Sequence, residues 1–199
     1  MFRQKQFQGT VRRPGMLAAV LFFCLVLACS AAEEVFVRPV QFDELIEKIS
    51  REYQLNPLFV HAMIWRESRF DARAKGTAGE IGLMQVRMGT VKDWAKAHKC
   101  KVPAASSVYD PELNLRIGIW RLDQALRNWE GYPDQTFLAL YEYNAGRKAI
   151  LRALAHCDGE VPHLMNSMRQ SAAYARQITA KFEEYVREQE GLRELADIP

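Results

Sequence analysis

The stretch Ala62-Met63-Ile64-Trp65-Arg66-Glu67-Ser68-Arg69-Phe70 predicts the second half of a helix with an apolar face. Asn56 is a favoured helix-capping residue and Pro57 suits a first helical turn, so the helix is expected to begin there. The positions at i, i+3, i+4 and i+7 on one side of this helix are Val60, Met63, Ile64 and Glu67. The spacing therefore places a carboxylate on the apolar side of the helix.

A carboxylate on an apolar helix face is either buried against a partner or kept for chemistry. Partial burial would raise the pKa of Glu67 by disfavouring its ionised form, which suits a general acid near neutral pH. The simpler interpretation is a glutamate at a helix end that pairs with Arg66 or Arg69. The helix by itself leaves both interpretations open.

The length and composition indicate one globular domain with a hydrophobic core. Of the 199 residues, 49% are hydrophobic and 26% are charged. The formal charge of +3 depends on Arg3, Lys5, Arg12 and Arg13 near the N-terminus. Without the first 32 residues, Lys and Arg fall from 27 to 23 against 24 Asp and Glu, a net charge of −1. The remaining chain is not basic, which argues against a nucleic-acid partner.

The first 32 residues are organised like a secretory signal peptide, with a basic start, an apolar run from Met16 to Ala28 and small residues. Cleavage after Ala32 would satisfy the small-x-small rule. Alternatively, Val26-Leu27-Ala28-Cys29 resembles a lipobox, and Cys29 would then carry a lipid at the outer membrane. The apolar run is short for a bilayer-spanning helix, which needs about 20 residues. Both interpretations export the domain to the periplasm.

Export changes the interpretation of the four cysteines. Cys24 lies in the signal, and Cys29 is either removed or lipidated, which leaves Cys100 and Cys157. Two cysteines in an oxidising compartment favour a disulfide, and two buried free thiols are the alternative. No CxxC or HxxxH spacing accompanies them, so no metal site is expected.

Helical periodicity predicts an all-α fold class with at most a small hairpin. The first helix has core positions at Phe42, Leu45, Ile46, Ile49 and Tyr53. The predicted Glu67 helix is followed by a Gly-bearing loop from Lys75 to Gly82 and a short apolar segment from Ile81 to Val86. No two-residue alternation indicates a longer strand, and a transmembrane bundle is excluded.

Helix start signals mark the middle of the chain. Thr90, with Asp93 in the following turn, predicts one helix N-terminus. Asp110-Pro111-Glu112 is a stronger signal, because it combines a capping residue, a first-turn proline and an acid that favours the helix dipole. We expect that helix to run to about Trp129.

The C-terminal third is expected to hold two helical segments and a tail. The first begins near Gln135, is interrupted near Asn144-Ala145-Gly146 and then resumes. The final helix is expected to open near Asn166. Residues 191–199 are charged and are expected to fray, so a single compact domain would occupy residues 33–190.

Four short motifs occur in a fixed order along this domain. They are Glu67-Ser68-Arg69-Phe70, Gly79-Glu80-Ile81-Gly82-Leu83-Met84-Gln85-Val86, Asp110-Pro111-Glu112-Leu113-Asn114 with Gly118 four residues on, and Ala139-Leu140-Tyr141-Glu142-Tyr143-Asn144-Ala145-Gly146. A weaker fifth match is Tyr174-Ala175-Arg176-Gln177-Ile178. Together, over about residues 43–180, they resemble the soluble lytic transglycosylase family, whose catalytic domain has a lysozyme-like fold with a substrate cleft.

This resemblance implies cleavage of the β-1,4 bond between N-acetylmuramic acid and N-acetylglucosamine in peptidoglycan, without metal or cofactor. Glu67 would protonate the glycosidic oxygen as general acid. The ionised Glu67 would then take the proton of the C6 hydroxyl as that oxygen closes onto C1. The product would be a 1,6-anhydro sugar, and no water would be consumed.

The substrate-binding residues that the resemblance implies are Ser68, Met84, Gln85, Tyr143, Asn144 and Tyr174. Ser68 and Gln85 would hydrogen-bond near the scissile sugar, and Met84 would form part of an apolar floor. Tyr143 and Asn144 would orient Glu67 or the muramyl ring. The simpler interpretations are that Ser68 bonds only to backbone and that Met84 and Tyr143 are core residues.

Two departures from the family pattern bear on function. Glu80 stands where the family usually has a small residue, and Arg147-Lys148 replaces small residues after the Tyr-Asn-Ala-Gly motif. A second carboxylate would allow a muramidase in which Glu67 and Glu80 act together on water, although Glu80 is equally consistent with a solvated loop residue. A non-catalytic peptidoglycan-binding or secretion-apparatus module is a third interpretation. Small exported members of the family suggest a secretion, pilus or conjugation machine as partner.

Overall fold

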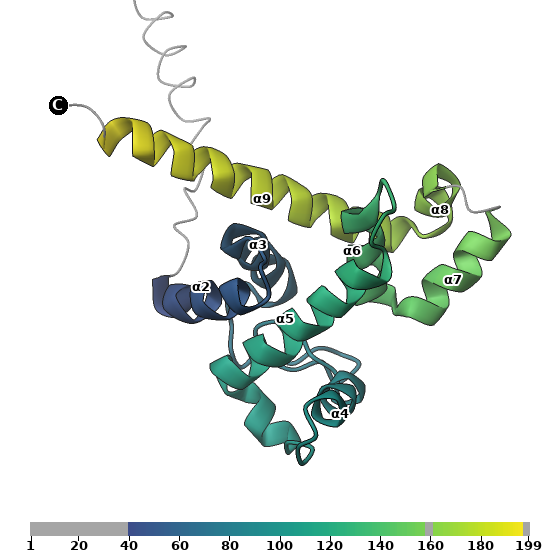
Figure 1. The fold of residues 1–199 in the computed structure, drawn as a ribbon, viewed down its shortest axis with the longest axis horizontal. Helices are drawn as coiled ribbons and strands as arrows, with labels where there is room; N and C mark the ends of the chain where they lie inside the picture. Colours follow the sequence, from purple (N-terminus) through teal and green to yellow (C-terminus); the bar gives the residue numbers. More distant parts are fainter. Residues whose placement is uncertain (1–39, 158–160, 197–199) are drawn as a thin grey trace, which may run out of the picture. The chain divides into compact units, whose positions relative to one another are not determined.

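Helix α3 (Pro57–Ser68) carries Glu67 and packs against the long helix α9 (Arg169–Ala196). The computed structural model describes residues 40–157 and 161–196, whose helices are shown in Figure 1. The predicted signal peptide, including Cys24 and Cys29, lies outside the described residues, as do residues 197–199.

The start of α3 follows from its capping residues. The Asn56 side chain accepts a hydrogen bond from the Leu58 amide at 2.9 Å, and Pro57 occupies the first turn. The helix ends where Arg69 adopts a left-handed backbone with φ 54°. The predicted start is therefore confirmed.

The apolar face of α3 fixes how the helix is rotated. Val60, Met63 and Ile64 are fully buried in the core, so the face that also bears Glu67 is turned inward. Helix α2 (Asp43–Glu52), which follows the short 3₁₀ helix η1 (Val40–Phe42), packs against α3 and α5. The predicted first helix is thus present.

Helix α5 (Pro111–Asn128) packs against α2, α4, α6 and the 3₁₀ helix η2 (Ala105–Tyr109). Its start is confirmed, because Asp110 Oδ1 accepts a hydrogen bond from the Leu113 amide at 2.9 Å. Helix α4 (Met88–Ala97) begins two residues before the predicted Thr90. The extended backbone of Arg87 forms its N-cap, so Thr90 lies within the first turn.

Helices α6 (Gln135–Ala145) and α7 (Arg147–His156) are separated at Gly146, as predicted. Gly146 has a φ of +82°, a conformation that side-chain-bearing residues rarely adopt. The chain therefore turns sharply at the end of the Tyr-Asn-Ala-Gly motif. This turn brings the motif to the edge of the candidate active site.

The last two helices differ from the sequence expectation. Asn166 lies in a separate short helix, α8 (Val161–Ser167), and α9 begins only at Arg169. Nothing in the local sequence explains the break between them. Helix α9 also continues to Ala196, so residues 191–196 are helical rather than frayed. The Glu and Arg residues on which the prediction of a frayed tail rests are also strong helix formers, and so is Leu.

Residues 69–87 form the loop between α3 and α4. Ile81 makes isolated antiparallel bridges with Lys75 and with Val86, which is the small hairpin that the sequence allowed. The described residues contain no longer strand. The buried Asn114 side chain fixes this loop, since Nδ2 donates to the carbonyl of Ile81 at 2.8 Å and Oδ1 accepts from the Met84 amide at 2.8 Å.

The predicted disulfide is wrong for this structure, because Cys100 and Cys157 are both free. Cys100 is exposed just after α4, and α4 packs on α5. Cys157 follows α7, which packs on α6 and α8, and its sulfur lies 3.8 Å from Ser167 Oγ. The two cysteines thus follow helices that belong to different parts of the fold (Figure 1).

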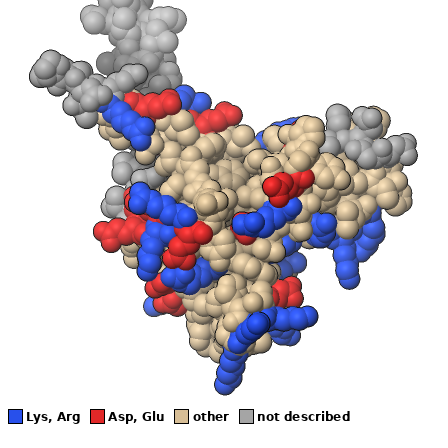
Figure 2. All heavy atoms as spheres, viewed as in Figure 1, with Lys and Arg blue, Asp and Glu red and all other residues tan. Residues whose placement is uncertain are grey.

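Acidic and basic side chains are interspersed over much of the face seen in Figure 2, in agreement with the small net charge. Within the described residues, no helix has the length and apolar character needed to cross a bilayer.

Candidate active site

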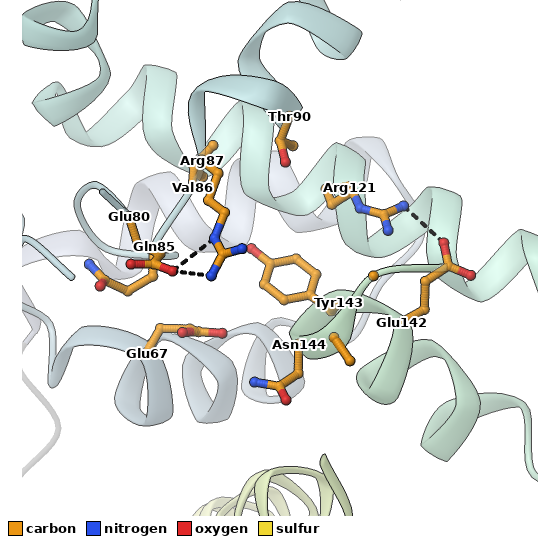
Figure 3. A pocket seen from close by; sticks show the side chains of 12 residues that line it. Glu67, Glu80, Gln85, Val86, Arg87, Thr90, Arg121, Glu142, Tyr143 and Asn144 are labelled. Carbon is orange, nitrogen blue, oxygen red and sulfur yellow. Dashed lines mark hydrogen bonds and ion pairs between the residues drawn. The ribbon is translucent and has the colours of Figure 1, made fainter. Parts of the chain in front are cut away.

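A cavity of about 230 Å³ opens beside the C-terminal end of α3 (Figure 3). Its walls come from α3, the loop before α4, the first turn of α4, helix α5, and the end of α6 with the turn that follows it. The lining residues are Glu67, Glu80, Gln85, Val86, Arg87, Thr90, Arg121, Glu142, Tyr143, Asn144, Ala145 and Gly146. Three of the four motifs found in the sequence therefore meet at one cavity.

Glu67 has the environment of a carboxylic acid that titrates near neutrality. Burial disfavours its charged form and raises the pKa from 4.5 to about 7, and nearby Glu80 adds to this effect. Opposing these, the Tyr174 hydroxyl donates a hydrogen bond to Glu67 Oε1 at 2.5 Å, and Arg66 supplies positive charge. The pKa thus lies where one carboxyl can act first as acid and then as base.

The alternative interpretation of Glu67, a surface ion pair, does not match its contacts. The Arg69 guanidinium lies over the Trp65 ring, 3.5 Å from its centroid. The Arg66 guanidinium lies 5.3 Å from the centroid of the Tyr174 ring. The hydrogen bond to the Glu67 carboxyl comes from a tyrosine on α9.

Glu80 lies in the same cavity but in a different electrostatic state. Burial acts to raise its pKa, but hydrogen bonds from its own amide, from Arg87 and from the Ala78 amide outweigh burial and hold the pKa below 4.5. Arg87 Nε donates to Glu80 Oε1 at 2.8 Å, and the Ala78 amide donates to Oε2 at 3.0 Å. Glu80 is therefore an ion-paired residue of the cavity wall and not a freely solvated one.

Gln85 and Tyr143, two of the predicted substrate-binding residues, both line the cavity. Gln85 has a left-handed backbone with φ 47°, and its side-chain amide donates to the Gly82 carbonyl at 2.9 Å. The Tyr143 hydroxyl donates to the Met84 carbonyl at 2.9 Å, and burial raises its pKa well above 10. Tyr143 is thus a neutral phenol that joins α6 to the loop.

Met84 and Ser68 do not line the cavity, in agreement with the simpler interpretations of both residues. The Met84 side chain is fully buried, and a Cβ on Gly118 would lie only 2.5 Å from its sulfur. It therefore cannot form the predicted apolar floor. Ser68 Oγ donates to the Leu83 carbonyl at 2.8 Å and so fastens the loop to α3.

Asn144 and Tyr174 make different contacts with the site. Asn144 is exposed at the cavity edge and accepts a hydrogen bond from Ser171 Oγ at 3.0 Å. It also borders a second, more open hollow, whose other walls are formed by Ala145 and residues 166–171. Tyr174 is 2% exposed and lies behind Glu67, so it contacts the carboxyl rather than the cavity space.

The cluster around Glu142 is not among the sites predicted from the sequence. This carboxylate is fully buried and accepts hydrogen bonds from Arg121, Asn128, Trp129 and Arg147. An acidic residue in the apolar run of α6 was the available signal, and Arg147 had been noted only as a departure from the family. Its partners on α5 could not be identified before the fold was known.

Among residues 40–157 and 161–196, no group of three His, Cys, Asp or Glu side chains is placed to hold a metal ion. The side chains that line the cavity carry carboxyl, phenol, amide, hydroxyl and guanidinium groups. One of these, Glu67, titrates near pH 7.

Residues 44–160 match the family described as the transglycosylase SLT domain. The match covers more than half of the chain and includes α3, the loop before α4, α5 and the α6–α7 turn. The chain belongs to the transglycosylase SLT domain family, as its motifs predicted.

Similar proteins include the membrane-bound lytic murein transglycosylase C of Actinobacillus succinogenes. It is 26% identical over 149 residues, which cover 72% of this chain and 42% of that protein. The protein of the same name from Haemophilus influenzae is 29% identical over 149 residues, with the same shares covered. The chain thus matches less than half the length of these relatives.

Solved structures agree on the fold. The lytic transglycosylase Slt from Pseudomonas aeruginosa, solved as an inactive mutant, superposes with a TM-score of 0.69 at 18% identity, covering 87% of this chain and 29% of that one. The 70-kDa soluble lytic transglycosylase from Escherichia coli gives 0.67 at 20% identity, covering 76% and 25%. The predicted all-α, lysozyme-like fold class is confirmed.

Proposed function

We propose that this chain is a peptidoglycan lytic transglycosylase that cleaves the β-1,4 bond between N-acetylmuramic acid and N-acetylglucosamine. The observation that carries the proposal is a carboxyl with a pKa of about 7 at a cavity built from three family motifs. A group with this pKa is about half protonated at neutral pH, so it can both donate and accept a proton during one catalytic cycle.

In the proposed reaction, Glu67 donates its proton to the glycosidic oxygen as the bond to C1 breaks. Positive charge develops on the muramyl ring, and the acetamido group of the substrate stabilises it. The carboxylate that remains accepts the C6 hydroxyl proton while the C6 oxygen bonds to C1. Glu67 returns to its protonated form, and the new chain end is a 1,6-anhydro sugar.

The surrounding residues supply positioning. Tyr174 steadies the ionised form of Glu67 through its 2.5 Å hydrogen bond, so it supports the second half of the reaction. Gln85 and Asn144 present amide groups at the cavity for hydrogen bonds with sugar hydroxyl or acetamido groups. Tyr143 holds the loop beside Glu67 through the Met84 carbonyl.

A muramidase is the second candidate, and the presence of Glu80 in the same cavity favours it. A second carboxylate can position a water molecule on the opposite face of the sugar. The contacts of Glu80 weigh against this role, because Arg87 neutralises its charge and occupies Oε1 while the Ala78 amide occupies Oε2. We therefore assign Glu80 a role in shaping the site.

The test is mass spectrometry of muropeptides released from purified peptidoglycan by the signal-free chain. Anhydro-muramyl ends, lighter by one water than reducing ends, are expected. Release of reducing muramyl ends would contradict the proposed transglycosylase activity and would support the hydrolase. The matched variants are Glu67→Gln, which should cut about 10³ times more slowly, and Glu80→Gln, which should still give anhydro ends. Sugar binding without cleavage by the unmodified chain would instead favour a non-catalytic binding module.

The cellular setting is a further part of the proposal. We assign the domain to the periplasm, with export directed by residues 1–32 and with a lipid on Cys29 as the mode of attachment. The names of the membrane-bound relatives support attachment. Fractionation of cells that express the chain or its Cys29→Ser variant tests this, since the variant should leave the membrane fraction. A secretion, pilus or conjugation machine is the proposed partner and would be recovered by crosslinking in the periplasm.

A further inference from the structure

The end of the cavity farther from Glu67 is built around a carboxylate that the proposed reaction does not use. Figure 3 shows Arg121 and Glu142 on one side of Tyr143, with Glu67 and Glu80 on the other. Arg121 Nη1 donates to Glu142 Oε1 at 3.0 Å, and Arg147 Nη1 donates to Oε2 at 3.1 Å. Three helices therefore contribute to this cluster.

Two neutral donors complete the shell of Glu142. Asn128 Nδ2 donates to Oε1 at 2.9 Å, and Trp129 Nε1 donates to Oε2 at 3.0 Å. Both carboxylate oxygens are thus doubly occupied, and the side chain has no exposed surface. Glu142 cannot contact a ligand itself, but it fixes the position of the two guanidinium groups.

The cluster carries excess positive charge, because two guanidinium groups surround one carboxylate. Elsewhere in the cavity, Arg87 is matched by Glu80. A guanidinium has five N–H donors. In Arg121, Nη1 is the one nitrogen that makes a hydrogen bond with the described residues. Arg121 lines the cavity with its side chain 24% exposed, so its remaining donors are available to a ligand.

The surroundings of this end also suit an anion. Helix α7 contains Arg147, Lys148 and Arg152 and no acidic residue, and Figure 2 shows basic side chains gathered at that end of the molecule. Ala145 and Gly146 also line the cavity, and a Cβ on Gly146 would meet no atom within 4 Å. A planar anionic group therefore has both space and donors.

We propose that Arg121, oriented by Glu142 and supported by Arg147, is a subsite for a carboxylate carried by the muramyl unit of the substrate. A guanidinium fork matches a carboxylate through two parallel hydrogen bonds. The carboxylate has two sources in peptidoglycan: the lactyl group of a muramic acid without a peptide, or the peptide stem. This subsite rests on the proposed function, because it names the part of the same substrate that the cavity selects.

A buried ion pair that only ties α5, α6 and α7 together would require no ligand. The two roles differ in what they predict for substrates with and without charge. A ligand-binding arginine makes the affinity depend on the carboxylate, whereas a structural arginine affects all substrates alike. The decisive measurement is therefore a comparison across substrates rather than a loss of activity.

The experiment measures binding by calorimetry, in the full exported chain carrying Glu67→Gln so that no cleavage occurs. The probes are soluble tetrasaccharide fragments of peptidoglycan in three forms: stems intact, stems removed by an amidase, and stems intact with all carboxylates converted to methylamides. Each is tested with Arg121→Gln, Arg121→Lys and the control Arg116→Gln. Arg116 lies on the same helix but pairs with Glu112 and Glu52 away from the cavity.

We expect Arg121→Gln to weaken binding of a charged fragment about tenfold and to leave the methylamide fragment unchanged. Arg121→Lys should recover only part of the loss, because it keeps the charge but not the fork. Arg116→Gln should bind all three fragments like the parent chain, which carries Glu67→Gln alone. Tight binding of the stem-free fragment would identify the lactyl carboxylate as the ligand of Arg121. Loss of binding when the stem is removed would identify a carboxylate of the peptide stem.

Equal weakening of all three fragments by Arg121→Gln, with an unchanged melting temperature, would overturn the subsite and leave a positioning role. Unchanged binding of the charged fragments would overturn it as well. Cleavage by the chain with intact Glu67 is measured separately. Carboxylate-dependent binding without cleavage would contradict the proposed activity but support the subsite. Absence of any binding would contradict both.

Discussion

The two ends of the cavity hold two carboxyl groups with opposite surroundings. Glu67 receives a single side-chain hydrogen bond, from Tyr174, and burial raises its pKa to about 7. Glu142 receives four hydrogen bonds, two of them from guanidinium groups. The comparison shows that the number of hydrogen-bond donors around a carboxyl, more than how deeply it is buried, decides its role. Glu67 remains able to exchange a proton, whereas Glu142 fixes the positions of its neighbours.

The largest effect on stability is expected from Glu142→Ala. This change leaves the buried Trp129 Nε1–H without its acceptor, which costs about 1–3 kcal/mol, and it also leaves the partly exposed Arg121 and Arg147 without their carboxylate. The measurement is the free energy of unfolding in urea. Glu112→Ala, which removes a solvent-exposed pair with Arg116, is the control and should change the free energy of unfolding far less. Equal losses would contradict the comparison.

Glu67→Gln is expected to increase the free energy of unfolding at alkaline pH, whereas Glu142→Ala decreases it. Folding raises the pKa of Glu67 from 4.5 to about 7, so between these values the folded chain binds more protons than the unfolded chain. The stability contributed by this group is therefore present below about pH 4.5 and is lost as the pH rises to about 7. At pH 8, Glu67→Gln should be more stable than the unmodified chain by up to about 3 kcal/mol. Unfolding curves at pH 4.5 and pH 8 test this, and an equal difference at both would contradict it.

A smaller effect is expected from Tyr174→Phe, which removes the hydrogen bond to Glu67. That hydrogen bond favours the ionised carboxylate and lowers its pKa, so its loss should raise the pKa of Glu67 further. Cleavage depends on the protonated form, and the alkaline limb of the kcat/KM profile should move up by about one pH unit. The exposed Tyr132→Phe variant should leave the profile in place. An unmoved limb in Tyr174→Phe would show that the phenol does not act on Glu67.

The smallest effect is expected from Glu80→Gln. The negative charge of Glu80 is the weakest of the influences that act on the pKa of Glu67, and it acts upward. Its removal should lower that pKa slightly, and the alkaline limb should shift down by a fraction of a pH unit. The released muropeptides should keep their anhydro ends. A large shift would mean that Arg87 does not neutralise Glu80 as the ion pair implies.

Much of this arrangement follows from local sequence. Asn56 and Asp110 each precede a proline, and this pairing of cap and first-turn residue located the starts of α3 and α5. The 3.6-residue period placed Glu67 on the inward face without knowledge of its partner. Such signals depend on neighbours within one or two turns, so they can be recognised before the chain is folded.

The rest depends on contacts between distant residues. Glu67 and Tyr174 are 107 residues apart, and the weak motif around Tyr174 gave no indication that its hydroxyl would reach a carboxyl. Met84 was expected at the substrate, but the close approach permitted by Gly118 draws it into the core. The oxidising compartment predicts a disulfide between Cys100 and Cys157. Both cysteines are free, because the helices that precede them do not bring them together.

The loop that forms one wall of the cavity is attached to three separate helices. Ser68 of α3 binds the Leu83 carbonyl, Asn114 of α5 binds Met84 and Ile81, and Tyr143 of α6 binds the Met84 carbonyl. This wall is therefore assembled only when α3, α5 and α6 have all come together. A chain that is still unfolded has no assembled cavity, so the proposed cleavage activity would arise only with the finished fold and would itself report that folding is complete.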